Sequence, residues 1–248
     1  MGAIANVDTA ASDTPDYFNF HVYCVPNSKN VIKEDKLKHY HKINTLFKRD
    51  MEAPGKPLIL DQFAKPEFEY LADNKWEWTE KVDGTNIVIE YTPEEGHKIG
   101  GRTERAQIPA DLYDAINKLL EPNLLVMKKI FESPIWLYGE GYGPKINKGG
   151  KYRPDPGFVL FDAFCGGFWL TRGSCINIAE TLNLDIVPVV GMGTIADAIK
   201  FVKAGFTSTW GDFVAEGIVL RPVVGMRARN GNRIITKLKH KDLNKGEQ

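Results

Sequence analysis

Alternation between apolar and polar positions dominates the middle of the chain, and this pattern is typical of half-buried β-strands. It is clear in KWEWTEK, and NIVIEY adds three consecutive β-branched residues. The segment TPEEG separates NIVIEY from HKIGGR, and such a Gly-containing connection between two strand-like runs predicts a hairpin. The strands predicted in this way cover residues 17–24, 67–71, 75–81, 86–91, 97–102, 135–143, 157–164, 216–222 and 233–240.

Apolar residues spaced three or four positions apart predict helices between these strands. Residues 33–50 mix charged and spaced apolar residues, which predicts a short helix leading into a loop. Residues 108–131 have helical spacing that is interrupted at Pro122. Because proline cannot continue a helix, two helices are predicted there. Residues 174–184 predict an amphipathic helix with Ser174 as its cap.

The segment TIADAIKFVKAG carries signals for both ends of a helix. Thr194 begins it, and Asp197 follows three residues later, which resembles a capping box. Gly205 ends it, and glycine is the usual residue where a helix stops. A helix is therefore predicted between Thr194 and Gly205.

The order of the predicted elements indicates the fold class. Strands outnumber helices, and the helices are inserted between strands without regular alternation, which predicts an α+β fold with antiparallel sheets. The sequence shows no internal repeat and no Pro/Ser-rich linker. We therefore expect one catalytic domain over residues 61–248, preceded by an N-terminal extension over residues 1–60 that is partly mobile.

Composition and charge narrow the possible partners. The chain has 248 residues with 32 basic and 32 acidic side chains, so its formal net charge is zero. A neutral protein has no overall attraction to nucleic acid, and any such binding must use a local basic surface. One candidate is the stretch between residues 221 and 245, which contains eight basic residues and only one acidic residue.

The cysteines and the apolar runs bear on the compartment. Cys24, Cys165 and Cys175 are odd in number and lack CxxC spacing, so neither a disulfide framework nor a zinc site is predicted. This pattern indicates a reducing, cytoplasmic environment. The sequence contains no apolar run long enough to span a membrane and no basic-then-apolar secretory signal at its start.

Lys81 stands out because it lies where a predicted strand meets an Asp83-Gly84 turn. Functional side chains are often found at strand ends and loops held by a rigid scaffold. The K-x-D-G pattern alone is a weak signal, since a solvated lysine beside a turn is common. Its weight increases with the segments that follow in order along the chain: GGRTERAQIP, LYGEGYG, FVLFDAF, EGIVLRP and TKLKH.

Together these segments resemble the ordered motifs of the covalent nucleotidyltransferase superfamily, which includes RNA ligases, ATP-dependent DNA ligases and mRNA capping guanylyltransferases. The EKVDGTN form around Lys81 is most similar to the phage-type RNA ligase 2 family. The resemblance covers about residues 75–240. It implies the nucleotidyltransferase fold of ligase adenylation domains, and ATP and Mg²⁺ or Mn²⁺ as cofactors.

The resemblance implies that Lys81 is the nucleophile that attacks the α-phosphorus of ATP. A lysine amine must lose its proton to attack, and both burial and nearby cations favour the neutral form. Lys237 and Lys239 are two residues apart on a predicted strand, so their side chains point to one face. They can supply that positive charge and neutralise charge that develops on the α-phosphate.

The carboxylates and one aromatic residue have implied roles around the nucleotide. Asp83 and Glu216 are the expected metal contacts, because Mg²⁺ prefers oxygen ligands and keeps several waters, although Asp83 could serve the turn alone. Glu216 is also expected to act at the phosphates. The resemblance places Glu140 at the ribose. It places Phe161 against the adenine, although a strand phenylalanine of this kind is also ordinary core composition.

Three further residues complete the expected nucleotide site. Arg102 follows two glycines and is expected to contact the nucleotide or the RNA end. The resemblance implies adenine recognition near Glu80 and contacts with the reacting phosphate near Asn86. Asp162 follows Phe161, and strand alternation places its side chain on the opposite face, so we expect a structural role for it.

The implied reaction has three steps: a lysyl-AMP forms on Lys81, AMP moves to a 5′-phosphate end, and a 3′-hydroxyl then seals the break as AMP leaves. Only nine residues follow Lys239, so no OB domain is expected, and a protein partner is a possible aid in holding nucleic acid. RNA ends are favoured as substrates, in a role such as RNA repair, with a nicked duplex as one form. A minimal DNA ligase, a GTP-dependent capping enzyme and a non-catalytic nucleic-acid binder are the alternatives.

Overall fold

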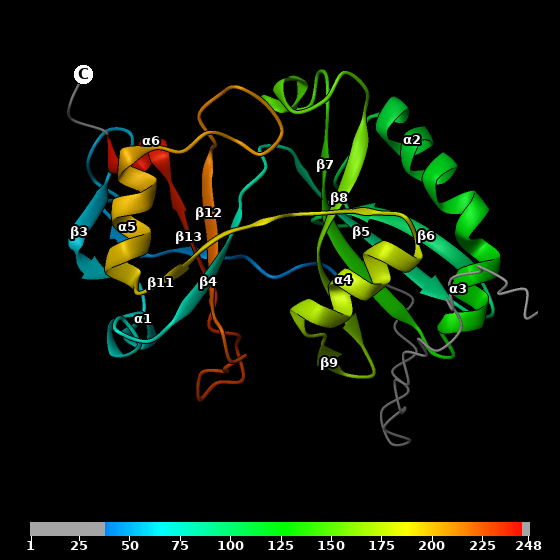
Figure 1. Ribbon diagram of the computed structural model, residues 1–248, viewed down its shortest axis with the longest axis horizontal. Helices are drawn as coiled ribbons and strands as arrows, with labels where there is room; N and C mark the ends of the chain where they lie inside the picture. The colour runs from blue at the N-terminus through cyan, green and yellow to red at the C-terminus, as the bar shows by residue number, and fades with distance from the viewer. Residues whose placement is uncertain (1–37, 245–248) are drawn as a thin grey trace, which may run out of the picture.

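The computed structural model describes residues 38–244, which form two sheets that stand side by side (Figure 1). The first sheet has five strands in the order β1-β13-β12-β4-β11. Its strands are β1 (Asn44–Thr45), β13 (Thr236–Lys239), β12 (Gly217–Pro222), β4 (Trp76–Glu80) and β11 (Val189–Gly193). All neighbours in this sheet are antiparallel except β1 and β13.

The second sheet contains six strands, five of them in the order β10-β8-β7-β5-β6, with β9 paired to β8. These are β10 (Asp185–Ile186), β8 (Gly157–Cys165), β7 (Ile135–Tyr142), β5 (Thr85–Thr92), β6 (Gly96–Gly101) and β9 (Phe168–Trp169). A separate two-stranded ribbon joins β2 (Phe47–Arg49) to β3 (Leu58–Phe63). The described chain is therefore α+β with mainly antiparallel sheets, and this prediction is confirmed.

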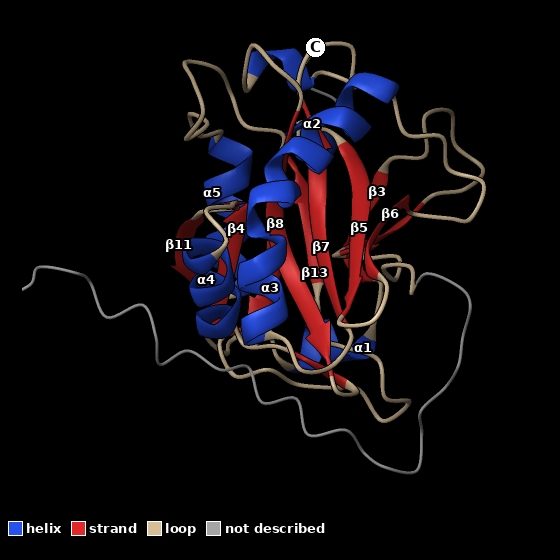
Figure 2. Cartoon of the chain, turned by 90° about the vertical axis from the view of Figure 1, so that its right-hand side faces the viewer, coloured by secondary structure: helices blue, strands red, loops and turns tan. Residues whose placement is uncertain are grey.

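Each sheet has its own hydrophobic core, covered by helices on the side away from the other sheet (Figures 1 and 2). The larger sheet packs against α2 (Ala110–Leu120), α3 (Leu124–Ile130) and α4 (Arg172–Thr181), and the short helix η2 (Glu121–Asn123) joins α2 to α3. The smaller sheet packs against α1 (Pro66–Tyr70), α5 (Ile195–Ala204) and α6 (His240–Leu243).

Several local predictions are confirmed. The helical segment 108–131 divides at Pro122, and the hairpin of β5 and β6 forms around TPEEG. Helix α5 has the predicted capping box: the Thr194 side chain accepts a hydrogen bond from the Asp197 backbone, and the Asp197 carboxylate accepts one from the Thr194 backbone. Gly205 follows this helix with a φ of 77°, a backbone conformation that suits glycine.

Three local predictions are wrong. The segment 67–71 was expected to be a strand, but Pro66 starts helix α1 there and Glu67 stabilises its first turn. The helix predicted over 33–50 is not present in its described part, where β1 and β2 form instead and bury Leu46 between them. Helix α4 is capped by Thr171 three residues before Ser174, whose backbone N–H donates to the Thr171 hydroxyl.

The described part of the predicted N-terminal extension, residues 38–60, packs into the body of the protein. Residues 38–43 cross from the larger sheet to the smaller one, where β1 pairs with β13 (Figure 1). The Tyr138 hydroxyl donates to the Lys38 carbonyl at 2.8 Å, and the Tyr40 hydroxyl donates to Asp162 Oδ2 at 2.8 Å. The predicted strand 17–24 lies outside the described residues.

A β-bulge in β8 places Phe161 and Asp162 on the same side of the larger sheet. Tyr138 pairs with Asp162 and the next residue, Gly139, pairs with Leu160, which leaves Phe161 without a partner in the register. The expectation that alternation sends Asp162 to the opposite face is therefore wrong, because a bulge interrupts alternation. The structural role expected for Asp162 follows from its contacts, since its side chain is fully buried.

Asp162 joins the two sheets through charged contacts. Arg233 Nη1 donates to Asp162 Oδ2 at 2.5 Å, and Arg221 Nη1 lies 3.9 Å from Asp162 Oδ1. The Arg233 guanidinium also lies 4.3 Å from the centre of the Trp169 ring. The carboxylate therefore holds β8 against two arginines from the opposite side of the cleft.

Two further observations concern membranes and cysteines. No helix in the described part of the chain is long and apolar enough to cross a bilayer. Cys165 is disulfide-bonded, whereas Cys175 is a buried free thiol with its pKa raised to about 12, mainly by burial. One bridge does not make a disulfide framework, but it was not expected from the cysteine spacing.

We predict that Asp162→Ala lowers the free energy of unfolding by about 3–5 kcal/mol, because it leaves two arginines without their buried counter-charge. Urea unfolding followed by tryptophan fluorescence measures this loss. Asp73→Ala is the matched control, since Asp73 is exposed and expected to change stability by less than about 0.5 kcal/mol. Equal stability of the two variants would contradict the sheet-joining role.

Candidate active site

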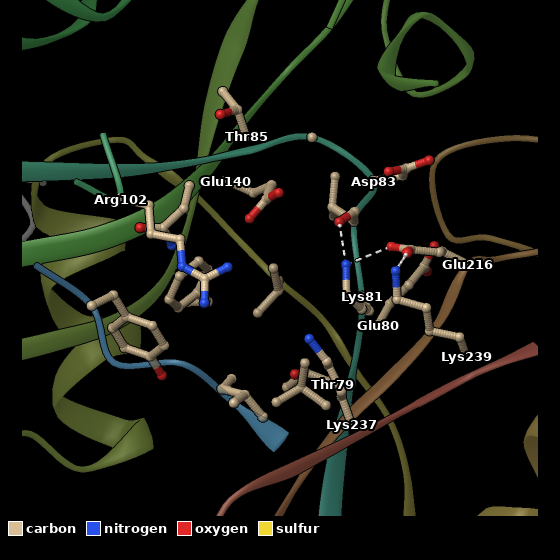
Figure 3. Close-up of a pocket in the computed structure, with 18 of the residues that line it drawn as sticks. Thr79, Glu80, Lys81, Asp83, Thr85, Arg102, Glu140, Glu216, Lys237 and Lys239 are labelled. Atoms are coloured by element: carbon tan, nitrogen blue, oxygen red, sulfur yellow. Dashed lines mark hydrogen bonds and ion pairs between the residues drawn. The ribbon is translucent and has the colours of Figure 1, made fainter. Parts of the chain in front are cut away.

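The two sheets enclose a cavity of about 420 Å³ between the sides that face each other (Figure 3). This volume is within the usual range for a small-molecule site. Every residue that the sequence singled out as catalytic, nucleotide-binding or metal-binding lines it: Glu80, Lys81, Asp83, Asn86, Arg102, Glu140, Phe161, Glu216, Lys237 and Lys239. The structure thus brings residues from six separate segments to one place, while their individual roles stay predictions.

Lys81 directly follows β4, and both its backbone and its side chain make hydrogen bonds. Its backbone N–H donates to the Gly217 carbonyl at 2.9 Å. Its ammonium lies 2.6 Å from Glu216 Oε2 and donates to the Val82 carbonyl at 3.3 Å. The turn that follows requires glycine, because a Cβ on Gly84 would lie 2.2 Å from the Gly141 carbonyl oxygen.

Glu216 bridges two lysines that come from the strands on either side of β12, since Lys81 follows β4 and Lys239 ends β13. While Glu216 Oε2 contacts Lys81, its Oε1 lies 2.5 Å from the Lys239 ammonium. Lys237 is two residues earlier on β13 and lines the same cavity, as the strand alternation predicted (Figure 3). The pKa of Lys237 is lowered to about 8, mainly by burial and, to a smaller extent, by the charges of Lys81 and Lys239.

Glu140 lies on β7 directly across from Asn86 on β5. Burial raises the pKa of the Glu140 carboxyl to about 7, against a smaller opposing effect of the Lys81 charge. The Asn86 side-chain oxygen is buried and has no hydrogen-bond partner among the described residues. Arg102, at the end of β6, is exposed at the cavity mouth and its guanidinium points inward (Figure 3).

The Glu80 carboxylate is engaged with the segment that precedes Glu216. The Ser208 hydroxyl donates to Glu80 Oε1 at 2.6 Å, and the Thr209 backbone N–H and hydroxyl donate to Oε2 at 2.9 and 3.0 Å. Only 1% of Glu80 is exposed. The Glu80 side chain therefore fixes this loop. Adenine recognition near Glu80 stays a prediction, and it would have to use the Glu80 backbone because the carboxylate is already hydrogen-bonded.

Phe161 forms one wall of the cavity, on the same side of β8 as Val159 two residues earlier. Val219, on β12 of the other sheet, also lines the cavity, so an aromatic and an aliphatic wall are both available to a planar ring. Arg221 Nη2 donates to the Phe161 carbonyl at 3.5 Å, and the Tyr40 ring packs edge-on against Phe161 with centroids 5.0 Å apart.

Sequence reasoning missed several cavity residues. Tyr40 and His41 belong to the crossing segment, and nothing in the sequence shows that this segment reaches the cavity. Asn147 follows the LYGEGYG motif by a few residues and lines the cavity from a loop. The position of Asn147 close to that motif is the signal in the sequence that could have indicated it. Arg221 also lines the cavity, although the sequence indicated it only as a member of the basic stretch.

The basic stretch 221–245 does not form one surface. Arg221 and Arg233 contact the buried Asp162, and Lys237 and Lys239 line the cavity. Exposed positions hold Arg227, Arg229 and Lys241, and the remaining member of the stretch, Lys245, lies outside the described residues. This candidate for a phosphate-following surface therefore divides into Asp162 contacts, cavity residues and exposed residues.

The carboxylates fit a metal that the nucleotide helps to hold. The described residues contain no group of three or more His, Cys, Asp or Glu side chains suited to a metal ion. Mg²⁺, however, usually takes only one or two protein carboxylates, with phosphates and waters as its other ligands. Asp83 and Glu216 both line the cavity, which meets that requirement, although Glu216 would share its oxygens with the lysines.

Comparisons with known proteins agree with this geometry. A model of the RNA ligase family matches residues 74–239. No curated protein matches the chain. The fold is shared with Naegleria gruberi RNA ligase: a mutant with ATP and Mn superposes with a TM-score of 0.58 and 16% identity over 86% of this chain and 63% of that one. The same ligase with PPi superposes with a TM-score of 0.57 and 17% identity, over 85% of this chain and 63% of that one. An apo mutant superposes with a TM-score of 0.56 and 18% identity, over 73% of this chain and 54% of that one. The chain spans less than two thirds of these structures.

We predict that Glu140→Gln removes a pH-dependent loss of stability. Below about pH 4.5 the carboxyl is protonated whether the chain is folded or not. Between pH 4.5 and about 7 the unfolded chain ionises first, so the wild-type protein loses stability as the pH rises. Glutamine cannot ionise, and the variant should be more stable than wild type by about 1–3 kcal/mol at pH 8 and nearly equal to it at pH 4. Urea unfolding at both pH values tests this, and an equal difference at both would contradict it.

A second prediction concerns the Glu80 contacts. Glu80→Ala removes three hydrogen bonds and should lower the free energy of unfolding by about 1–3 kcal/mol, because the buried Ser208 hydroxyl and two Thr209 donors lose their partner. Residues 206–215 should also become more sensitive to limited proteolysis. Glu52→Ala, at an exposed position, is the control. Unchanged proteolysis would show that the contacts do not fix this loop.

Proposed function

The chain belongs to the RNA ligase family, and from that premise we propose that it is an ATP-dependent RNA ligase that joins a 5′-phosphate end to a 3′-hydroxyl end. The observation that carries this proposal is the position of Lys81. Its amine lies inside a nucleotide-sized cavity, 2.6 Å from Glu216, with Lys237 and Lys239 lining the same space. A single lysine flanked by cations and a carboxylate is suited to nucleophilic attack on a phosphate.

In the first step the Lys81 amine attacks the α-phosphorus of ATP, an N–P bond forms, and pyrophosphate leaves with the electrons of the broken P–O bond. The amine must give up a proton, and Glu216 is in direct contact with it and can accept that proton. Lys237 and Lys239 offset the negative charge that develops on the α-phosphate. Their position on one face of β13 lets both act on the same group.

The other cavity residues are assigned to binding ATP. In this proposal adenine lies between Phe161 and Val219, and Glu140 accepts a hydrogen bond from the ribose. Arg102 and Asn86 contact the phosphates at the open side of the cavity. Asp83 and Glu216 would hold Mg²⁺ or Mn²⁺, which would neutralise charge on the triphosphate.

The two later steps use the same centre. An oxygen of the RNA 5′-phosphate attacks the phosphorus of lysyl-AMP, the N–P bond breaks, and a 5′-5′ pyrophosphate link forms. The 3′-hydroxyl of the second end then attacks the 5′-phosphate, and AMP leaves with the electrons of the broken P–O bond. The cations around Lys81 serve each step because each moves a negatively charged phosphate through this site.

Several finer points belong to the proposal. RNA is favoured over DNA at the break, and the substrate is either a single strand or a nicked duplex. A protein partner is one way of holding it. We also propose residues 61–248 as the adenylation domain, with residues 38–60 packed into it. A cytoplasmic location is a further proposal.

We predict that the protein becomes labelled when it is incubated with Mg²⁺ and α-labelled ATP and run on a denaturing gel. Lys81→Ala should lose the label completely, because the proposal assigns the N–P bond to the Lys81 amine alone. Lys75→Ala, an exposed lysine before the same strand, should keep full labelling.

Parallel incubations with labelled GTP and NAD separate the alternatives. Label from ATP alone, followed by sealing of RNA and not of DNA ends, supports the proposal. Label from GTP would favour a capping enzyme, and equal sealing of DNA would favour a minimal DNA ligase. Label that persists in Lys81→Ala would overturn the nucleophile assignment.

A further inference from the structure

The loop between β7 and β8, residues 143–156, is attached to the turn that follows the nucleophile. We call it the lysine loop. The Asn147 side-chain amide donates to the Gly84 carbonyl, and the Asp83 backbone N–H donates to the Tyr152 hydroxyl at 3.2 Å. In Figure 1 the loop lies at the top of the view, where it includes the short helix η3 (Gly149–Lys151). It therefore borders the mouth of the cavity at Asp83 and Gly84.

The backbone of the lysine loop is held in one shape. Ile146 and Tyr152 are 4% and 7% exposed, so two of its side chains are anchored in hydrophobic clusters. The chain also approaches itself closely, since a Cβ on Gly149 would lie 2.6 Å from the Gly143 nitrogen. Lys145, with a φ of 64°, adopts a left-handed conformation that costs energy for a residue other than glycine. Such strain persists only where the surroundings enforce it.

The exposed side chains of this rigid loop are basic. Lys145, Lys148 and Lys151 are all exposed, and Asp155 is the one acidic residue between 143 and 156. Arg153 is already engaged, since it lies 3.8 Å from Asp185 and over the Tyr142 ring. In a chain with zero net charge, three exposed lysines beside the catalytic turn form a local positive surface.

We propose that Lys145, Lys148 and Lys151 bind the phosphate backbone of the RNA strand that carries the 5′-phosphate. This inference rests on the proposed function, and it assigns that function a docking surface. Inside the cavity, Lys237, Lys239 and Arg102 are available to the triphosphate of ATP, whereas the three loop lysines face solvent outside it. A strand whose end reaches Lys81 past the Asp83-Gly84 turn would run along this loop.

Lysine contacts of this kind position a strand without reading its bases. They bind through release of counterions, so the affinity should fall with salt, by a slope of about 0.7 for each phosphate contact on a single strand. The docking surface therefore predicts binding that tolerates any sequence and depends strongly on ionic strength.

The test is the triple variant K145Q/K148Q/K151Q, which removes three charges and keeps three polar side chains. Binding is measured by fluorescence anisotropy with a 5′-phosphorylated, 3′-labelled RNA oligonucleotide at several salt concentrations. We expect the Kd at 100 mM salt to rise by roughly tenfold or more, and the salt slope to fall by about 2. Lysyl-AMP formation from ATP should stay within about twofold of wild type.

The matched control is K118Q/K128Q/K129Q, which removes three exposed lysines from α2 and α3 on the outer face of the larger sheet. It should leave both the Kd and the salt slope unchanged. Each single variant, K145Q, K148Q or K151Q, should lower the slope by about 0.7, which keeps the proposal testable if the triple variant folds poorly.

Two results would overturn the proposal. One is RNA binding by the triple variant with the Kd and slope of wild type. The other is a loss of lysyl-AMP formation from ATP without a change in RNA binding, which would assign the loop to the triphosphate. Because anisotropy needs no catalysis, a wild-type protein that binds RNA through this loop but forms no lysyl-AMP would refute the proposed function and leave the docking surface standing.

Discussion

The Glu216 carboxylate, shared between Lys81 and Lys239, is the contact on which the rest of the site depends. Three lysines line one cavity of about 420 Å³, and like charges this close repel one another strongly when water is partly excluded. The repulsion is visible in Lys237, whose pKa is lowered by burial and by its two neighbours. One carboxylate between two ammonium groups makes the arrangement stable in the absence of an anion. The same excess of positive charge is suited to receive a phosphate.

The spacing of the two sheets sets the width of that cavity. Phe161 and Asp162 both face the cleft because of the bulge in β8, and their side chains make different contacts there. Asp162 draws in Arg221 and Arg233 and so fixes how closely the sheets approach. Phe161, held beside it, then has a defined position opposite Val219. Because of the extra residue in β8, one strand carries both the charged connection between the sheets and the aromatic wall of the cavity.

The sequence was informative where a function depends on order along the chain and uninformative where it depends on long-range pairing. The resemblance carried by the ordered motifs identified all ten predicted cavity residues, and most of them lie at or near a strand end or turn that the local pattern already marks. The bulge at Phe161 leaves no local signal, since FVLFDAF reads as a plain buried strand. The contribution of Tyr40 depends on a crossing segment whose pairing with β13 is set by residues almost 200 positions away. Helix α1 was missed because EFEYL alternates like a strand, while Pro66 before it favours a helix start.

Glu80 and Lys81 show how adjacent residues can hold one loop at both ends. Strand alternation sends their side chains in opposite directions at the end of β4. Glu80 takes hydrogen bonds from Ser208 and Thr209, where the loop after α5 begins. Lys81 holds the other end, since its backbone N–H donates to Gly217 and its ammonium contacts Glu216. The carboxylate that balances the lysines is therefore positioned from the same strand that leads into Lys81. A change in the Glu80 contacts should reach the Lys81 amine through Glu216, although the Glu80 carboxylate is itself bound to Ser208 and Thr209.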